Sequence, residues 1–233
     1  MVLMHLKNNQ ETEKIMEGYK LYCKPTFENI PEEKRRKILE IAVREFAYNG
    51  FENANINIIA KKAEVSVGSL YKYFDTKTDL FLTSVNYGID SLKTIIDAVT
   101  NSDEDVMKRL EKIVRIAIEF SRINSVLIKL YNEVTSESNA ELADRIASDM
   151  ETVTAAAYKK VIMDGQAAGE IRTDIDPGMA AFFVDNLLMN IQFSYACDYY
   201  KKRYEIYAGK DIFKKDEFAV QNILRFIKAA LKD

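Results

Sequence analysis

The chain has 233 residues, of which 48% are hydrophobic and 30% charged, with eight glycines, three prolines and a formal net charge of −3. This composition predicts a compact, mainly helical protein of one or two domains. No apolar run approaches the ~20 residues of a membrane span and no signal-peptide pattern opens the chain, so we expect a cytoplasmic protein with no membrane partner. One histidine (His5) and two isolated cysteines (Cys23 and Cys197) leave almost nothing for a metal site or a histidine-based triad, and we expect no metal and no cofactor.

Residues 1–30 precede the first strong helical pattern. Residues 11–24 could form one amphipathic helix, because Ile15, Met16, Tyr19 and Tyr22 are loosely periodic. A mobile tail and a helix that packs on the segment that follows are both open interpretations.

The first strong pattern opens at Pro31, a residue suited to the start of a helix. Ile38, Ala42 and Phe46 give this helix an apolar stripe at four-residue spacing. Gly50 has the residue type that ends helices in a left-handed conformation, so we expect the helix to end there.

Residues 55–77 contain two short helical patterns separated by a tight turn. Asn55 and Ser66 are good N-caps for the two helices, and Leu70 and Phe74 lie four apart on the inward face of the second. This arrangement predicts a helix-turn-helix whose second helix enters a DNA major groove, and residues 1–30 could then also be an arm that touches DNA.

The outward residues of the second helix are small, hydroxylic or basic, which suits close approach to DNA. Tyr71 and Tyr73 flank Lys72, so we expect both rings to be exposed, although they could instead cover the scaffold. Lys77 opposes the dipole of the next helix, a conflict that a nearby phosphate would resolve. Residues 31–81 hold nine basic and eight acidic side chains, a net of +1, so DNA contact depends on placement rather than on bulk charge. The predicted DNA-binding residues are Asn55, Ser66, Val67 (or a turn-packing residue), Gly68, Ser69, Tyr71, Lys72, Tyr73 and Lys77.

The runs VSVGSLYKYFDTKTDLF and ILEIAVREFAYNGFENANINIIAKKA resemble the recognition helix and first helices of the TetR family of bacterial transcriptional regulators. The strong resemblance covers about residues 31–82. Asn57 stands where many relatives carry Arg, and the resemblance adds it to the DNA-binding set. Glu64 stands where the family pattern usually has Gly. The family implies a helical body that binds a small effector and forms a homodimer, and a fourth helix that links head to body.

That fourth helix is predicted from Thr76, with Asp79 completing a capping box, toward Val99. Residues 179–200 read as one helix that is apolar on more than one face, which predicts burial on both sides, one of them by a partner subunit. The last helix has an apolar stripe that could complete this interface. The predicted dimer-interface residues are Met179, Phe183, Leu187, Ile191, Tyr195, Val220, Leu224, Ile227 and Leu231.

Aromatic residues of the body are candidates for the lining of an effector pocket. Asp185, Asn186, Asn190 and Gln192 interrupt the apolar helix, and interface pairs and pocket anchors are equally good interpretations of them. The predicted pocket residues are Phe120, Tyr131, Tyr158, Phe182, Phe183, Asn186, Asn190 and Phe193.

We therefore predict an all-α protein with an N-terminal extension (residues 1–30), a three-helix DNA-binding head (31–80) and a larger helical body for effector binding and dimerisation (81–233). The predicted function is a transcriptional repressor that a small apolar or amphipathic ligand releases from a near-palindromic operator in double-stranded DNA. The alternative keeps the DNA-binding head but makes the body a structural or partner-binding module without an effector. No nucleophile elbow, metal pair or phosphate-binding glycine loop indicates an enzyme.

Overall fold

A computed structural model describes residues 22–134 and 151–232, with the backbone alone for residues 89–97 and 152–153. Every regular element within these ranges is helical, which confirms the all-α prediction. The predicted helix over residues 11–24 lies almost wholly outside the described residues. The helices are α2 (Pro25–Glu28), α3 (Glu32–Asn53), α4 (Ile56–Lys62), α5 (Val67–Tyr73), α6 (Lys77–Thr100), α7 (Val106–Ile123), α8 (Ser125–Val134), α10 (Thr152–Ala167), α11 (Pro177–Ala196), α12 (Asp198–Ala208) and α13 (Asp216–Leu231), with a 3-10 turn at Ile212–Lys214.

Side chains near each helix start explain where the head helices begin. The Asn55 carboxamide oxygen accepts the Asn57 N–H, and the Ser66 hydroxyl accepts the Ser69 N–H. At the start of α6, the Thr76 N–H donates to the Asp79 carboxylate and the Asp79 N–H donates to the Thr76 hydroxyl. These bonds satisfy N–H groups that have no partner inside their own helix. All three predicted caps are confirmed.

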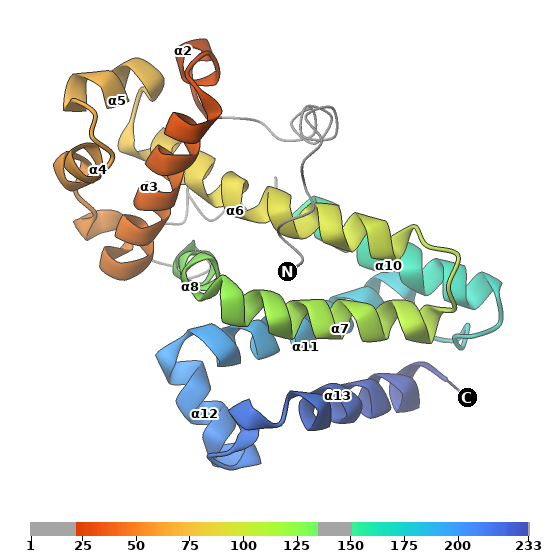
Figure 1. The fold of residues 1–233 in the computed structure, drawn as a ribbon. Coiled ribbons are helices and arrows are strands. Elements are labelled where there is room, and N and C mark those ends of the chain that lie inside the picture. Colours follow the sequence, from red (N-terminus) through yellow and green to blue (C-terminus); the bar gives the residue numbers. More distant parts are fainter. Residues whose placement is uncertain (1–21, 135–150, 233) are drawn as a thin grey trace.

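Helices α2–α5 gather at one end of α6, where Figure 1 shows them as a compact group at the upper left. Their buried side chains form one apolar cluster with the first turns of α6. Phe46 is central to it, because its ring lies 4.9 Å from Phe81 and 6.2 Å from Phe51. Leu130 of α8 is buried in the same cluster, so this core extends past the predicted head.

A break at Gly50 divides the end of α3. Gly50 has φ of 71° and ψ of 168°, values that other residues rarely adopt. A Cβ there would lie 2.8 Å from the Glu133 Oε1 of α8. Glycine therefore serves the break, and the flexible end of the Glu133 side chain lies beside it.

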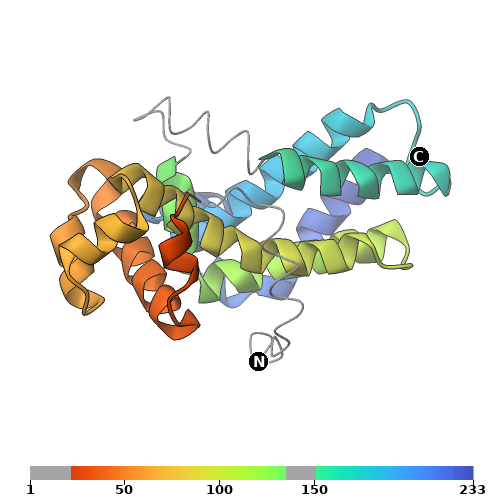
Figure 2. The same ribbon diagram turned by 90° about the horizontal axis from the view of Figure 1, so that it is seen from above.

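The second apolar cluster surrounds α7, against which α10, α11 and α13 pack. Seen from above, in Figure 2, these helices extend along the half of α6 that lies away from the head. Ion pairs tie α7 to α13: Arg115 Nη1 lies 2.6 Å from Glu217, and Arg122 Nη2 lies 2.5 Å from Asp216. The predicted boundary between residues 80 and 81 falls inside α6, which is continuous through it, and the division into domains stays a prediction.

The single helix predicted over residues 179–200 is wrong in one respect. Cys197 is extended, with φ of −99° and ψ of 133°, so α11 ends at Ala196 and α12 begins at Asp198. The Tyr200 ring of α12 packs back on the Phe193 ring of α11, with 5.2 Å between centroids. None of the described helices is both long enough and apolar enough to cross a membrane.

Candidate DNA-binding surface and ligand cavity

Helix α5 has one buried face and one open face, as its sequence predicts. Leu70 is buried in the head cluster, and so is Phe74, which follows the helix directly. Gly68, Tyr71 and Lys72 are exposed on the open face. Val67 and Ser69 are partly buried, and Ser66, Asn55 and Asn57 are exposed at the starts of α5 and α4. Their contact with DNA stays a prediction, on a surface that the fold leaves accessible.

Tyr73 does not lie on the open face, which corrects its expected exposure. Its side chain is only 9% exposed, and its ring centroid lies 5.5 Å from that of Phe27 in α2. Phe27 also packs on Phe74 at 4.7 Å. The helix geometry of α5 alone left Tyr73 outward, but a helix from before the head covers that side.

Residues 22–30, here called the N-terminal strap, hold the C-terminal end of α5. The Lys24 N–H donates to the Tyr73 carbonyl at 2.8 Å, and Lys24 Nζ donates to the Tyr71 carbonyl at 3.1 Å. The Thr26 hydroxyl donates to the Lys72 carbonyl at 2.6 Å. Three carbonyls that lack partners at a helix end are thereby bonded. Residues 22–30 therefore pack on the head, whereas the helix predicted over residues 11–24 stays a prediction.

Glu64 occupies the turn between α4 and α5 with φ of 58°. This left-handed conformation favours glycine, the residue type that the family pattern usually has there. Lys37 Nζ of α3 lies 2.6 Å from the Glu64 carboxylate and holds its pKa below the usual range. Glu64 therefore has an unfavourable backbone conformation in the turn, while its side chain forms an ion pair on the surface.

Lys77 has partners inside the chain. Its Nζ donates to the Glu52 carbonyl at 2.9 Å and lies 5.1 Å from the centroid of the Phe51 ring. The dipole conflict from which a phosphate was inferred is therefore relieved by the C-terminal carbonyl of α3. A contact between Lys77 and a DNA phosphate stays a prediction that needs a different argument.

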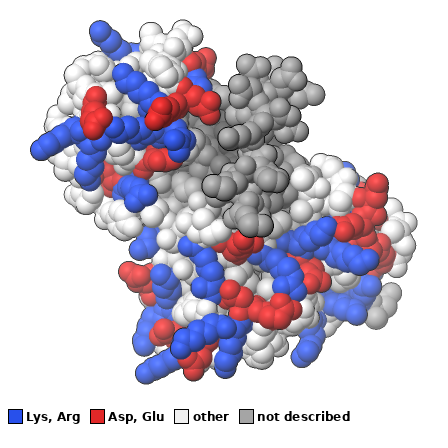
Figure 3. Space-filling model, viewed as in Figure 1, with Lys and Arg blue, Asp and Glu red and all other residues white. Residues whose placement is uncertain are grey.

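The charge on the head is mixed. Figure 3 shows basic side chains over the head with acidic ones among them, rather than one continuous basic face. Within the basic cluster near the start of α3, Arg35 donates to the Glu28 carbonyl at 2.5 Å and Arg36 lies 3.5 Å from Glu40. Affinity for DNA would consequently depend on a few placed groups, as the net charge of residues 31–81 indicates.

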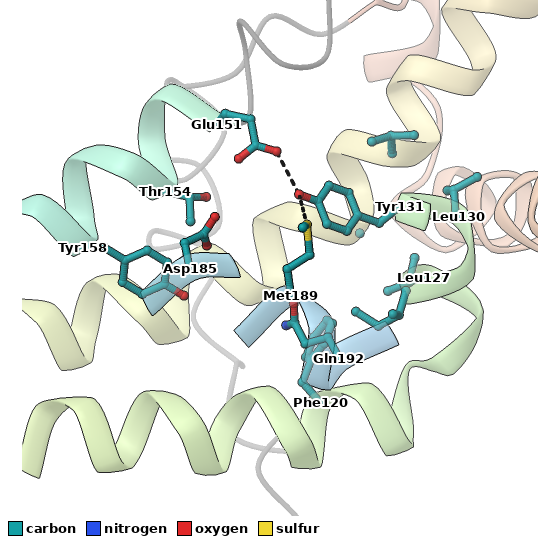
Figure 4. Close-up of a pocket in the computed structure, with 13 residues that line it drawn as sticks. Phe120, Leu127, Leu130, Tyr131, Glu151, Thr154, Tyr158, Asp185, Met189 and Gln192 are labelled. Carbon is teal, nitrogen blue, oxygen red and sulfur yellow. Dashed lines mark hydrogen bonds between the residues drawn. The ribbon is translucent and has the colours of Figure 1, made fainter. Parts of the chain in front are cut away.

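A cavity of about 90 Å³ lies in the body, between α6, α7, α8, α10 and α11. At ~10–15 Å³ for each water-sized sphere, it has room for a small molecule of several heavy atoms. Figure 4 shows side chains from these helices turned toward one another around it. Its lining residues are Val85, Gly88, Phe120, Leu127, Ile128, Leu130, Tyr131, Glu151, Thr154, Tyr158, Asp185, Met189 and Gln192.

Three of the predicted pocket residues line this cavity: Phe120, Tyr131 and Tyr158. The other predictions are corrected. Phe182 and Phe183 are 58% and 52% exposed on the outer face of α11, and their ring centroids lie 6.1 Å apart.

Asn186 and Asn190 lie along the same outer side of α11, where each carboxamide donates to the carbonyl four residues before it. Phe193 is buried behind the lining, with its ring centroid 5.7 Å from that of Tyr131. Of the four polar residues with two open interpretations, Asp185 and Gln192 line the cavity. Seven-residue spacing, which places both on one helix face, could have paired them.

The polar side of the cavity is acidic. The Tyr131 hydroxyl donates to Glu151 Oε1 at 2.8 Å and lies 3.9 Å from Met189 Sδ. Burial, together with the negative charge of Glu151, raises the pKa of the Asp185 carboxyl to about 6. Burial also raises the pKa of Tyr158, so this hydroxyl stays neutral.

The cavity touches the head through α8. Leu130 lines it and is also buried in the head cluster, against which Leu127 and Tyr131 pack. Gly88 of α6 faces Leu127 so closely that a Cβ would lie 2.6 Å from the Leu127 Cδ2. The sequence indicated only α6 as a link between body and head, and the packing of α8 on α3 adds a second one.

The predicted dimer residues divide into exposed and covered ones. Met179 and Phe183 are exposed, and Leu187, Ile191 and Leu224 are partly buried. Four others are corrected because the chain itself covers them. Tyr195 is buried, and its hydroxyl donates to Asp216 Oδ1 at 2.7 Å. The stripe on α13 faces α7 rather than a partner, so its buried members are Val220, Ile227 and Leu231.

The outer side of α13 instead exposes Phe218 and Phe226, at 58% and 63%. No group of three or more potential metal ligands occurs among residues 22–134 and 151–232.

Residues 38–83 match the family model for bacterial regulatory proteins of the tetR family. The chain is 23% identical over 163 residues to the HTH-type transcriptional regulator YhgD of Bacillus subtilis (strain 168), covering 70% of this chain and 84% of the relative. It is 23% identical over 198 residues to the "Probable acrEF/envCD operon repressor" of Escherichia coli (strain K12), covering 82% and 85%. Its fold is similar to that of the transcriptional regulator FadR from Bacillus subtilis in complex with stearoyl-CoA, with a TM-score of 0.66, 18% identity, and coverage of 81% of this chain and 97% of that one.

Proposed function

The chain belongs to the TetR family of bacterial regulatory proteins, and on that premise we propose that it represses transcription from an operator that a small ligand makes it release. The single observation that carries this proposal is the capped helix-turn-helix. Its second helix is fixed at both ends, by Ser66 and by the N-terminal strap, and presents Gly68, Tyr71 and Lys72 to solvent. A rigid helix with a small residue near its start suits entry into a major groove.

We propose that the protein acts as a homodimer through the outer faces of α11 and α13. Met179, Phe182 and Phe183 are exposed on α11, and Phe218 and Phe226 on α13. Large apolar side chains that are exposed on a helix face are candidates for an interface. In an isologous dimer each face would meet its own copy, and two heads would then contact two half-sites about 34–36 Å apart or a multiple of that.

The proposed release depends on the shared packing of cavity and head. A ligand larger than the present cavity must displace lining side chains, among which Leu130 belongs to both regions. Because packed interiors shift between discrete arrangements rather than deform smoothly, movement of α8 and α6 would turn the head relative to its twin. The ligand then favours a separation of recognition helices that fits the operator poorly.

The alternative of a body without an effector predicts a solid core. The cavity favours the ligand model, because polar side chains from α8, α10 and α11 converge on a space that has apolar walls.

A nuclease footprint on the DNA that flanks the chain's own gene tests the function. We expect protection of one near-palindromic site, with affinity at least ~10³-fold above that for random duplex at the same salt concentration. Equal affinity for both duplexes would contradict the proposal.

A further inference from the structure

The body cavity is lined by two carboxyl groups and by no basic side chain of the described residues. Asp185 and Glu151 both line it, and none of the Lys or Arg residues that the structure describes does. The Tyr131 hydroxyl donates to Glu151, whereas Asp185 has neither a hydrogen bond nor an ion pair with any described residue. An ionised carboxylate in such a place lacks the compensation that buried charges normally have.

A second polar group in the cavity also lacks a partner. Tyr158 is only 5% exposed, and its side chain lines the cavity without a hydrogen bond to another described residue. Figure 4 shows this side chain on the α10 wall, with its hydroxyl on the side where Asp185 lies. A hydroxyl that lines a cavity without a protein partner is free to form a hydrogen bond with a ligand there.

The other walls are apolar and aromatic. Phe120, Leu127, Ile128 and Met189 provide them. An aromatic ring at the polar end, Tyr131, can also face a cation. The lining also includes the neutral polar side chains of Thr154 and Gln192. A ligand complementary to the two carboxyl groups and to the apolar walls has an apolar body and one end that donates hydrogen bonds and carries positive charge.

We propose that the effector is an amphipathic amine, whose ammonium group lies between Asp185 and Glu151 and whose apolar body lies against Phe120, Leu127 and Met189. This inference rests on the proposed function in so far as the cavity ligand is the effector. An ammonium donates up to three hydrogen bonds, which matches the two carboxylates and the Tyr158 hydroxyl. A carboxylate or phosphate head group in the same place would add a third negative charge, so fatty acids and acyl thioesters of phosphate-bearing carriers are excluded.

Matched pairs of compounds test the charge directly. Phenethylamine is compared with 3-phenylpropionate, and decylamine with decanoate below micellar concentrations, by calorimetric titration of the full chain without DNA at about pH 7.5, where Asp185 is mainly ionised. We expect at least one amine to bind saturably and each amine to bind at least ~10-fold more tightly than its acid, the effect of one charge-assisted contact. Tighter binding of either acid, or no saturable binding of either amine, would overturn the inference.

Asp185→Asn removes the charge and keeps the shape of the side chain. It should weaken amine binding at least ~10-fold and narrow the difference between amine and acid. Glu119→Gln is the matched control, because Glu119 is exposed on α7 and does not line the cavity. Thermal unfolding of both variants reports folding separately, and equal amine affinity in Asp185→Asn and the wild type contradicts the assignment.

These titrations contain no DNA, so their outcome is independent of the footprint. Operator protection with no preference for amines would retain the proposed regulator and reject this ligand class.

Discussion

The head and the body differ in whether their polar groups have hydrogen-bond partners. In the head, the carbonyls at the end of α5 are bonded by Lys24 and Thr26, and Lys77 and Glu64 both have partners. In the body cavity, Asp185 and Tyr158 line the open space without a hydrogen bond to another described residue. A satisfied network rigidifies, and an unsatisfied one leaves free energy that a ligand can recover. This difference is what we expect if the proposed function is correct, with a preformed surface for DNA and a cavity that its ligand completes.

The largest expected effect comes from a substitution that blocks the predicted DNA-contact face of α5 and leaves the rest of the protein unchanged. Gly68→Leu should lower operator affinity at least ~100-fold, because a bulky side chain would stand between α5 and the groove. The chain itself has room, since a Cβ at Gly68 would approach only the Ser66 hydroxyl, at 3.8 Å. Electrophoretic mobility shifts and thermal unfolding measure the two properties. Lost folding, or unchanged operator binding by a folded variant, would contradict the assignment of α5.

The next effect concerns the outer face of the body. The double variant Phe183→Glu with Phe226→Glu should be monomeric and bind the operator at least ~10-fold more weakly, because it places charges in the core of the proposed interface. Ile206→Glu is the control, since Ile206 is equally apolar and 73% exposed but lies on α12. Sedimentation at micromolar concentration distinguishes the states. A dimeric double variant, or a monomeric wild type, would reject this interface.

The third prediction concerns how protein stability and amine affinity depend on pH through Asp185 in the cavity. Because the pKa of Asp185 is raised to about 6, above its ~3.9 in an unfolded chain, folding favours its protonated form and this group contributes more stability as pH falls from 6 to 4. Amine binding needs the carboxylate, so affinity should fall about 10-fold between pH 7.5 and pH 5. The groups that face Asp185 are Glu151 and Tyr158 of the α10 side and Tyr131 of α8, and the raised pKa values of both tyrosines keep them neutral.

Asp185→Asn should remove most of this dependence. The same tenfold loss in that variant would place the titrating group elsewhere.

The smallest effect lies in the turn of the head. Glu64→Gly and Glu64→Ala both lose the pair with Lys37, but only glycine relieves the φ of 58°. Glu64→Gly should therefore be more stable than Glu64→Ala by about 1 kcal/mol, the cost of a left-handed residue less the added flexibility of glycine. Urea unfolding of the two variants measures this difference, and equal midpoints would mean that the turn relaxes without strain.

Local signals made the head predictable. The caps at Asn55, Ser66 and Thr76 join residues two or three apart, so the residue types alone locate the helix starts. The predicted exposure of Tyr73 was wrong because Phe27, which lies 46 residues earlier in the chain, covers its ring. A contact between residues so far apart in sequence leaves no local pattern. The left-handed backbone conformation of Glu64 could not be predicted either. The sequence showed only that Glu64 stands where the family pattern usually has Gly.

The arrangement of the body was less predictable because its helices do not each have a single apolar face. α11 is apolar on several sides, so periodicity could not decide which side faces α7, the cavity or a partner. The stripe on α13 was real, but it faces α7 rather than a second chain. Glu151 was missed entirely, since its place beside Tyr131 depends on how α10 and α8 meet.

The central claim is that the cavity and the head are energetically coupled through α8 and α6. The most direct measurement is the affinity of the tightest-binding amine of the panel for the protein with and without saturating operator duplex. Since linkage is reciprocal, operator should weaken amine binding by the factor with which amine weakens operator binding, typically ~5–150-fold. Equal amine affinities in the two titrations would leave a DNA-binding protein and a ligand site with no switch between them.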